Sequence, residues 1–337
     1  MSGRNVALYF AWNHPDEANA QLGILDNRWA TIFEIRRVTW PRSEDLAGPA
    51  IDQGIEGTLQ YRVLANYRVF AERTQAWTGN PLRIVERIAA TQTLLDEDFL
   101  SSIDTLIVIS LDGWRARQTA KPQEIDAVKA FLANADHNVF VCPHHDIGNV
   151  DGLAPEETIK RQEAELLHHG DHAIPPQQSF GSFGLSLLAG LGAPIRSRFG
   201  LRAAHEPDGS PSPLEIAENA DRFGVLAGVT TLNLHMHLPH FEPVDEGAEK
   251  YDVLARQKID LSAPPHPFVA AGHDRFNAIL QAKPGVFHGQ LVVCDATIWA
   301  SVFGGLENLE QLWQNVVKRP RRAGKQPGSI AVLFSVP

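Results

Sequence analysis

Residues 103–110 read Ile-Asp-Thr-Leu-Ile-Val-Ile-Ser and residues 138–142 read Asn-Val-Phe-Val-Cys, and these two stretches decide the fold. Both are apolar runs without alternation, which is typical of strands that are covered on both faces. Between them, Pro122 begins a segment with helical spacing, whose apolar positions are Ile125, Val128, Phe131 and Leu132. A strand, a helix and a second strand predict a crossover between two parallel strands, so we expect an α/β protein.

Further elements are expected on both sides of this crossover. Buried strands are predicted at residues 6–12, 29–38, 229–237, 289–295 and 330–336, and Pro239 and Pro243 should end the third of them. Helices are predicted within residues 58–98, including a second helix over residues 82–95, and at residues 154–169, 183–191 and 306–317. We expect a single domain over residues 1–337 with a helical insertion near residues 58–98.

Charge and composition argue against several classes of protein. The 337 residues carry a net charge of −10, so broad binding to nucleic acid is not expected. Basic residues near the end of the chain are expected in a solvated loop after a helix: Lys318, Arg319, Arg321, Arg322 and Lys325. We expect no membrane span and no signal peptide. Two cysteines, Cys142 and Cys294, do not make a disulfide framework, which favours the cytoplasm.

Three more stretches, taken in order with the crossover, resemble a known family. Residues 223–229 read FGVLAGV, residues 289–295 read GQLVVCD and residues 307–315 read ENLEQLWQN. Together they resemble the class I glutamine-amidotransferase-like superfamily and are most similar to its trehalose-utilisation-type branch. The resemblance implies a three-layer sandwich with a mostly parallel, flavodoxin-like sheet. It does not imply one activity, because members include amidotransferases, proteases and hydrolases.

Cys142 lies where the nucleophilic cysteine of such amidotransferases would lie, at the end of the central strand. Their partner motif is His-x-Glu, and His240-Phe241-Glu242 has this spacing, so a Cys142–His240–Glu242 triad is one hypothesis. The residue after the nucleophile should donate its backbone N–H to an oxyanion, but Pro143 has no N–H. We favour the alternative, in which Cys142 is a small buried residue at a strand end.

Histidines are clustered near two predicted strand ends. His144 and His145 follow the central strand at its carboxyl edge, where open α/β sheets bind ligands. His235 and His237 alternate along a predicted strand, so both rings would point to one face. A metal site is predicted from His145, His235, His237 and His240. Zn²⁺, Fe²⁺ or Mn²⁺ would suit these ligands and would activate water. Acid–base chemistry by His144 without a metal, and simple strand packing, are the alternatives.

Two other histidine groups are weaker candidates. Residues 13–17 read Asn-His-Pro-Asp-Glu and resemble a motif of zinc-dependent N-acetyl-sugar deacetylases, although one acidic residue is missing. His14 would then line the cleft, or else the segment is an ordinary loop that caps a helix through Asp16. The group His168, His169 and His172 is expected to cap a helix end, where a cationic ring complements the helix dipole.

We therefore expect a hydrolase that acts on a small molecule with a C–N or related polar bond, through water activated by a metal or a histidine. The first alternative is a thiol amidohydrolase that uses Cys142. The second is a non-catalytic binding or assembly subunit. The expected partner is a small-molecule substrate, rather than nucleic acid or a membrane, and assembly as a homo-oligomer stays open.

Overall fold

The two stretches that predict the crossover form neighbouring parallel strands, β3 (Thr105–Ser110) and β4 (Asn138–Pro143), connected through helix α8 (Pro122–Leu132). The computed structural model describes residues 3–12, 65–88, 93–112, 118–144, 152–169, 180–232, 237–296 and 306–319. Every residue of β3 and β4 is buried, as expected for strands that are covered on both faces. The predicted α/β fold is confirmed.

The main sheet has eight strands in the order β2-β1-β3-β4-β10-β9-β8-β6. Its first five strands are parallel and include β2 (Arg83–Glu86), β1 (Val6–Ala11) and β10 (Gln290–Cys294). In chain order they run 2-1-3-4-5, which is the flavodoxin-like arrangement. The sheet continues with antiparallel strands β9 (Arg275–Ala282), β8 (Tyr251–Lys258) and β6 (Glu215–Ile216).

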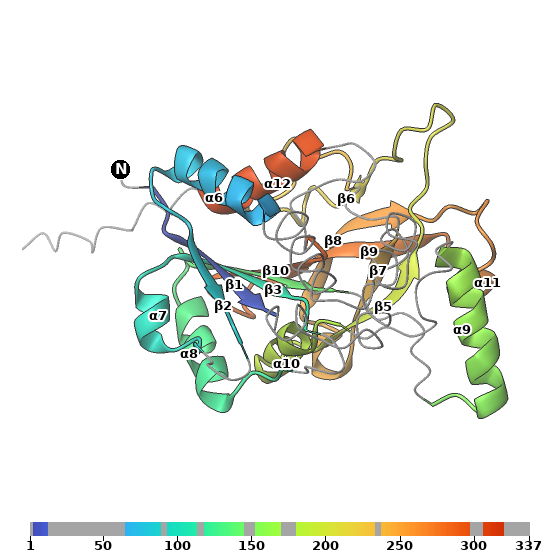
Figure 1. Ribbon diagram of the computed structural model, residues 1–337, viewed down its shortest axis with the longest axis horizontal. Helices are drawn as coiled ribbons and strands as arrows, with labels where there is room; N and C mark the ends of the chain where they lie inside the picture. Colours follow the sequence, from blue (N-terminus) through green and yellow to red (C-terminus); the bar gives the residue numbers. More distant parts are fainter. Residues whose placement is uncertain are drawn as a thin grey trace, which may run out of the picture.

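Helices cover both faces of the parallel strands and complete a three-layer sandwich (Figure 1). On one face lie α6 (Ala65–Thr78) and α12 (Leu306–Lys318), and on the other lie α7 (Glu97–Ser101), α8 and α10 (Ser182–Gly190). Alternate residues of β1 enter two separate cores. Leu8 and Phe10 join the core that contains Trp313, whereas Ala7 and Tyr9 join the core that contains Phe183.

A second, two-stranded sheet lies beside the antiparallel half of the main sheet (Figure 1). It pairs β5 (Ile195–Leu201) with β7 (Leu238–Pro243) in antiparallel orientation. Helices α9 (Pro155–His169) and α11 (Pro267–Ala270) lie next to it, and the short 3-10 helix η2 (Asp245–Gly247) follows β7. Phe199 in β5 has φ of 65°, a conformation that bulky side chains rarely adopt, at a place where the pairing register shifts.

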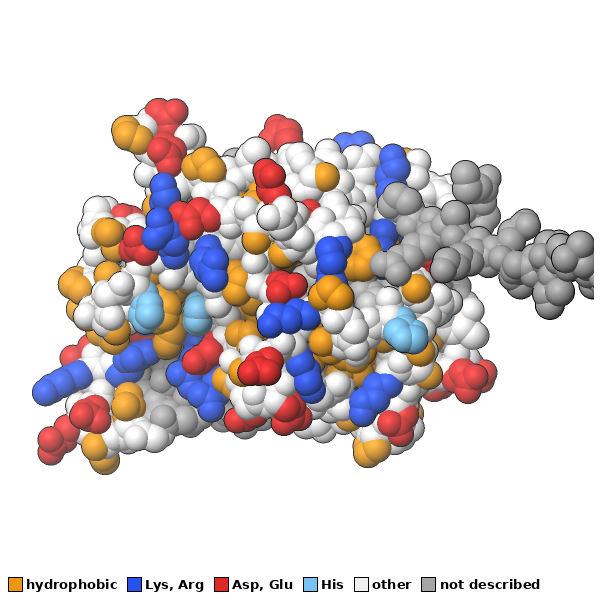
Figure 2. All heavy atoms as spheres, turned by 180° about the vertical axis from the view of Figure 1, so that it is seen from behind, with side chains coloured by type: hydrophobic (Ala, Val, Ile, Leu, Met, Phe, Trp, Pro, Cys, Tyr) orange, Lys and Arg blue, Asp and Glu red, His pale blue; other side chains and the backbone are white. Residues whose placement is uncertain are grey.

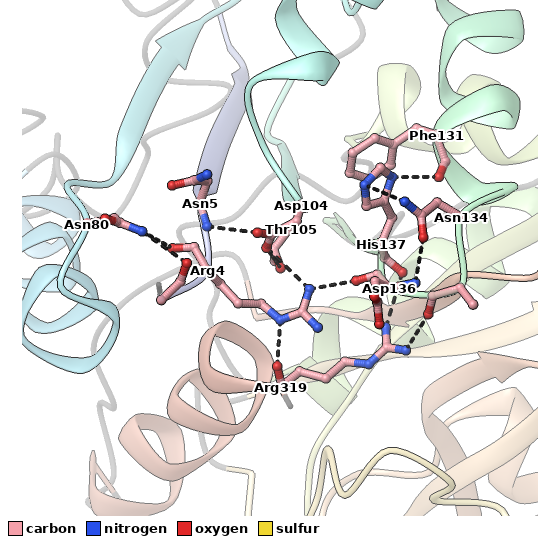
Figure 3. Close-up of polar contacts among 12 residues, drawn as sticks. Arg4, Asn5, Asn80, Asp104, Thr105, Phe131, Asn134, Asp136, His137 and Arg319 are labelled. Carbon is pink, nitrogen blue, oxygen red and sulfur yellow. Dashed lines mark hydrogen bonds and ion pairs between the residues drawn. The ribbon is translucent and has the colours of Figure 1, made fainter. Parts of the chain in front are cut away.

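Two buried arginines tie the amino edge of the sheet to the end of α12 (Figure 3). Arg4 forms an ion pair with Asp104 at 3.3 Å and also donates to the backbone carbonyl of Arg319. The guanidinium of Arg319 donates to the carbonyls of Ala135 and His137 after α8. The prediction that Arg319 lies in a solvated loop is therefore wrong, because only 4% of this residue is exposed. We call the contacts of Arg4 and Arg319 with Asp104 and with these backbone carbonyls the arginine clasp.

Two element predictions are wrong. The sequence predicts a helix over residues 82–95, but Arg83–Glu86 form β2. This strand pairs with β1 and is the edge strand of the sheet. The strand expected at residues 229–237 instead begins at Leu238, and both Pro239 and Pro243 lie inside it. These prolines are tolerated because β7 belongs to a two-stranded sheet, which has only edge strands. The strands expected at residues 29–38 and 330–336 lie outside the described residues.

The surface carries charges of both signs. On the face shown in Figure 2, Lys and Arg side chains are interspersed with Asp and Glu rather than gathered into one basic area. Within the described part of the chain, no helix combines the length and hydropathy that a membrane crossing requires.

Candidate functional site

The carboxyl ends of four parallel strands meet at one edge of the main sheet. Within two residues of the ends of β1, β3, β4 and β10 stand Trp12, Asp112, His144 and Asp295. Because these strands are in parallel register, the four residues share the edge at which open α/β sheets bind ligands. This carboxyl edge is the candidate site.

His144 and Asp295 form a histidine–carboxylate dyad at the centre of this edge. Nδ1 of His144 lies 3.1 Å from Oδ1 of Asp295. The carboxylate is 1% exposed and the imidazole is 14% exposed. Because a carboxylate only accepts hydrogen bonds, the contact assigns the proton of the neutral ring to Nδ1 and the acceptor lone pair to Nε2. A buried acid thus orients a more accessible base, as in the catalytic triads of hydrolases.

The backbone of His144 is held by the neighbouring elements. Its N–H donates to the carbonyl of Ser110 in β3, at 3.2 Å, and its carbonyl accepts from Oγ of Ser197 in β5, also at 3.2 Å. Gly181 has φ of 78° and packs so closely that a Cβ there would lie 3.0 Å from both N and O of His144. The ring of Phe180 meets the imidazole edge-to-face, with centroids 5.0 Å apart. These contacts from β3, β5 and residues 180–181 fix the position of His144 in the dyad.

Asp112, two residues after β3, ties the candidate site to the start of α10. Its carboxylate accepts from Oγ of Ser110 at 2.6 Å and from the backbone N–H groups of Gln118 and Phe183. Oγ of Ser110 in turn accepts from the N–H of Gly184. Burial raises the pKa of Asp112 to about 6, although these hydrogen bonds oppose the rise. With its oxygens committed to backbone donors, Asp112 has a structural role.

Cys142 is completely buried in β4. Burial raises the pKa of its thiol well above the ordinary value, and the nearby Cys294 and Asp295 raise it further. The neutral thiol is therefore favoured, whereas a nucleophile needs the thiolate. The phenol of Tyr67 is also buried near Cys142 and Asp295, and its pKa is raised well above the ordinary value, mainly by burial.

His240 and Glu242, the other members of the predicted triad, lie on β7. Nδ1 of His240 accepts the backbone N–H of Asn277 in β9, and its ring meets Phe268 of α11. Burial lowers the pKa of His240 to about 4. Glu242 lies 3.4 Å from the guanidinium of Arg198 in β5. Among the described residues no hydrogen bond joins either side chain to Cys142, and the triad stays a prediction.

The predicted metal ligands fall in different parts of the chain. His145 and His235 lie outside the described residues, as does His14. His237 precedes β7 rather than alternating along a strand, and Nδ1 of His240 already accepts a backbone N–H. Across residues 3–12, 65–88, 93–112, 118–144, 152–169, 180–232, 237–296 and 306–319, no three His, Cys, Asp or Glu side chains form a group that could hold a metal. The metal site also stays a prediction.

Asp295 and Ser197 are functional candidates that sequence reasoning missed. Asp295 ends the apolar run of β10, so its position directly after a parallel strand is a signal that could have been used. What the sequence does not indicate is that β10 is the neighbour of β4. Ser197 carries no comparable signal, because it lies within a strand that was not predicted.

No family model and no curated protein matches the chain. Among solved structures, it is similar to a protein from Bacteroides uniformis described as ThuA-like. The two chains are 10% identical with a TM-score of 0.38, and the match covers 94% of this chain and 93% of that one.

Proposed function

We propose that the carboxyl edge of β4 and β10 is the active site of a hydrolase for a small polar molecule, with His144 as general base. One observation carries the proposal, namely the 3.1 Å contact between Nδ1 of His144 and Oδ1 of Asp295. It combines a buried carboxylate with a more accessible imidazole, at the edge of a flavodoxin-like sheet where ligands commonly bind.

The chemistry follows from the ring tautomer. Nε2 would accept a proton from water as the water oxygen attacks the carbon of a C–N bond. The resulting imidazolium is stabilised by the carboxylate of Asp295, which also keeps the ring in place. The same proton then passes to the leaving nitrogen, so that the bond breaks and His144 returns to its neutral form.

Hydrolysis of a panel of small amides and activated esters tests the assignment. His144→Gln should lower kcat for any hydrolysed compound by about 10²–10⁴-fold, the usual range for removing a general base. His288→Gln is the matched control, because His288 is exposed and its ring contacts the carbonyl of Ala133, at the opposite end of β10 from Asp295. Loss of activity in both variants, or in neither, would contradict the role of His144.

The other two enzymatic readings have their own tests. His144 and Asp295 are also two groups that a divalent metal could bind, so purified protein is analysed for Zn, Fe and Mn, and the assay is repeated after chelation. Hydrolysis that is lost on Cys142→Ser but kept on His144→Gln would replace the proposal with thiol catalysis. If no compound in the panel is hydrolysed, a binding or assembly role gains support over catalysis.

A further inference from the structure

The most deeply buried side chains of helix α9 are ionisable. Between residues 155 and 168, the two buried side chains are those of Glu165 and His168. Ile159 and Leu167 are instead exposed. The helix lies beside β5 and α11 (Figure 1). Most amphipathic helices bury an apolar stripe, whereas α9 buries a carboxylate and an imidazole instead.

His168 is locked in one neutral tautomer by two backbone groups. Its Nδ1 lies 2.7 Å from the carbonyl of Pro264, to which it must donate. Its Nε2 accepts the N–H of Arg202, which follows β5, at 3.1 Å. The ring therefore joins α9 to two other segments of the chain. The bond from Arg202 requires the uncharged form, whereas the carbonyl of Pro264 can accept from either form and favours the charged one.

His266 forms the second half of the same contact. It caps the amino end of α11 through Nδ1, which accepts the N–H of Phe268 at 2.9 Å. Its Nε2 therefore carries the ring proton and faces Glu165 of α9, with Oε1 at 3.4 Å. The ring of His266 is fully buried and lies 5.2 Å from the ring of His168, centroid to centroid.

Protonation is costly for both rings because an imidazolium has no lone pair to accept a hydrogen bond. Each histidine would lose its bond from a backbone N–H, and two positive charges would be buried side by side. Burial lowers the pKa of both histidines below the ordinary value.

The surrounding charges act in both directions. Arg161 of α9 disfavours a charged His266, whereas Glu165 favours it. Arg202 disfavours a charged His168, and Asp260, which follows β8, favours it. The titratable rings of His240 and His273 lie farther off, behind Phe199 and Phe268 respectively.

We propose that His168 and His266 form a pH-sensitive latch, which holds α9 on β5 and α11 while both rings are neutral and releases the helix when they take up protons in mild acid. Release of α9 would expose the two rings to water, so their pKa would return toward the ordinary value of 6.5. At pH 5.5 this favours release by at most about tenfold per histidine, or about a hundredfold for the two together.

The position of α9 in the chain links the latch to the candidate active site. α9 lies between His144 and Phe180, whose rings are in contact. Release of α9 would therefore act between two residues that contact each other at the carboxyl edge. This consequence rests on the proposed function, whereas the latch itself does not.

Hydrogen exchange at pH 7.5 and pH 5.5 tests the latch directly. After correction for the intrinsic effect of pH on exchange, protection of residues 155–168 should fall by roughly ten- to a hundredfold at pH 5.5. Protection of α8, which belongs to the core, should stay the same. Equal protection of α9 at both pH values, a parallel fall in α8, or an α9 that is unprotected at pH 7.5 would each overturn the proposal.

Variants separate the latch from general loss of stability. His266→Asn keeps an oxygen that can cap α11 but cannot titrate, so the ratio of protection between the two pH values should shrink by up to about tenfold. The ratio is taken within each variant, so any cost of the substitution itself cancels. His288→Asn, the matched control, should keep the wild-type ratio. His144→Gln should also keep it, so a failure of the latch can be distinguished from a failure of the catalytic assignment. A wild-type ratio in His266→Asn would overturn the latch.

Discussion

His144 and Asp295 are separated by 151 positions in the chain, yet Nδ1 of one lies 3.1 Å from Oδ1 of the other. They meet because β10 joins the sheet directly beside β4, with Val141 and Val293 as partners near the carboxyl ends of the two strands. The dyad is thus a product of strand order rather than of a local motif.

Asp295→Asn should reverse the ring tautomer of His144. The amide of an asparagine can donate to Nδ1, which would move the proton of the neutral ring to Nε2 and remove the acceptor there. Nitrogen-15 shifts of the imidazole report the tautomer without any substrate. Asp126→Asn, an exposed change on α8, is the control. If the wild-type ring carries its proton on Nε2, the assigned geometry is incorrect.

Gly181→Ala should destabilise the protein and disturb His144. Gly181 has φ of 78°, where an L-residue costs about 1–2 kcal/mol, and a Cβ would also press on the backbone of His144 at 3.0 Å. Gly79→Ala is a close control, since Gly79 has the same φ of 78° and nothing lies within 4 Å of its added Cβ. Urea unfolding should show a larger loss for Gly181→Ala. Equal losses would mean that the close approach has no energetic effect.

Burial of Asp112 should make the protein less stable as the pH rises from about 4 to 6. The pKa of this carboxyl is raised from 3.8 to about 6, so between these values the folded state binds more protons than the unfolded state. Its contribution is complete below pH 3.8 and is lost as the pH rises through 6, by on the order of 3 kcal/mol. Asp112→Asn should remove this part of the pH dependence in urea unfolding, although the variant is less stable overall. Asp126→Asn should retain it.

Removing Glu124 should be far more damaging than removing a surface acid. Arg87 and Glu124 form an ion pair at 2.5 Å, and both side chains are almost completely buried. Glu124→Gln leaves a buried cation without its partner, which typically costs about 3–5 kcal/mol. The control is Glu215→Gln, because the Glu215–Arg275 pair is exposed and such pairs contribute about 0–1 kcal/mol. A double variant, Arg87→Met with Glu124→Gln, removes the uncompensated charge and keeps an amide oxygen that can accept from the N–H of Leu95, so it should recover part of the loss in thermal unfolding.

The parallel half of the sheet could be predicted because its strands are long apolar runs. In β3 and β4 every residue is buried, so the sequence shows no alternation and no charge. The antiparallel half was missed for the opposite reason. In β8, Arg256 and Lys258 are exposed while Leu254 and Gln257 are buried, so charges interrupt the apolar pattern. β7 contains two prolines, which ordinarily argue against a strand.

The candidate site was predicted only in part. His144 was identified from its place after a buried strand, but its partner depends on which strands are neighbours. Arg319 shows the same limit at the other edge of the sheet. Its neighbours in sequence are basic, which predicts exposure to solvent. In the structure Arg319 is buried, and its guanidinium donates to the carbonyls of residues 135 and 137.

The arginine clasp also constrains the order in which the protein is assembled during synthesis. The side chain of Arg4 and the carbonyl of Arg319 are 315 positions apart. At a translation rate of about 5–20 residues per second, Arg4 waits roughly 15–60 s before its partner has been made. Arg4 and the strand that follows it, β1, therefore lack this contact until residue 319 has been synthesised. A chain arrested before residue 319 should leave the amino end of β1 open to chaperones.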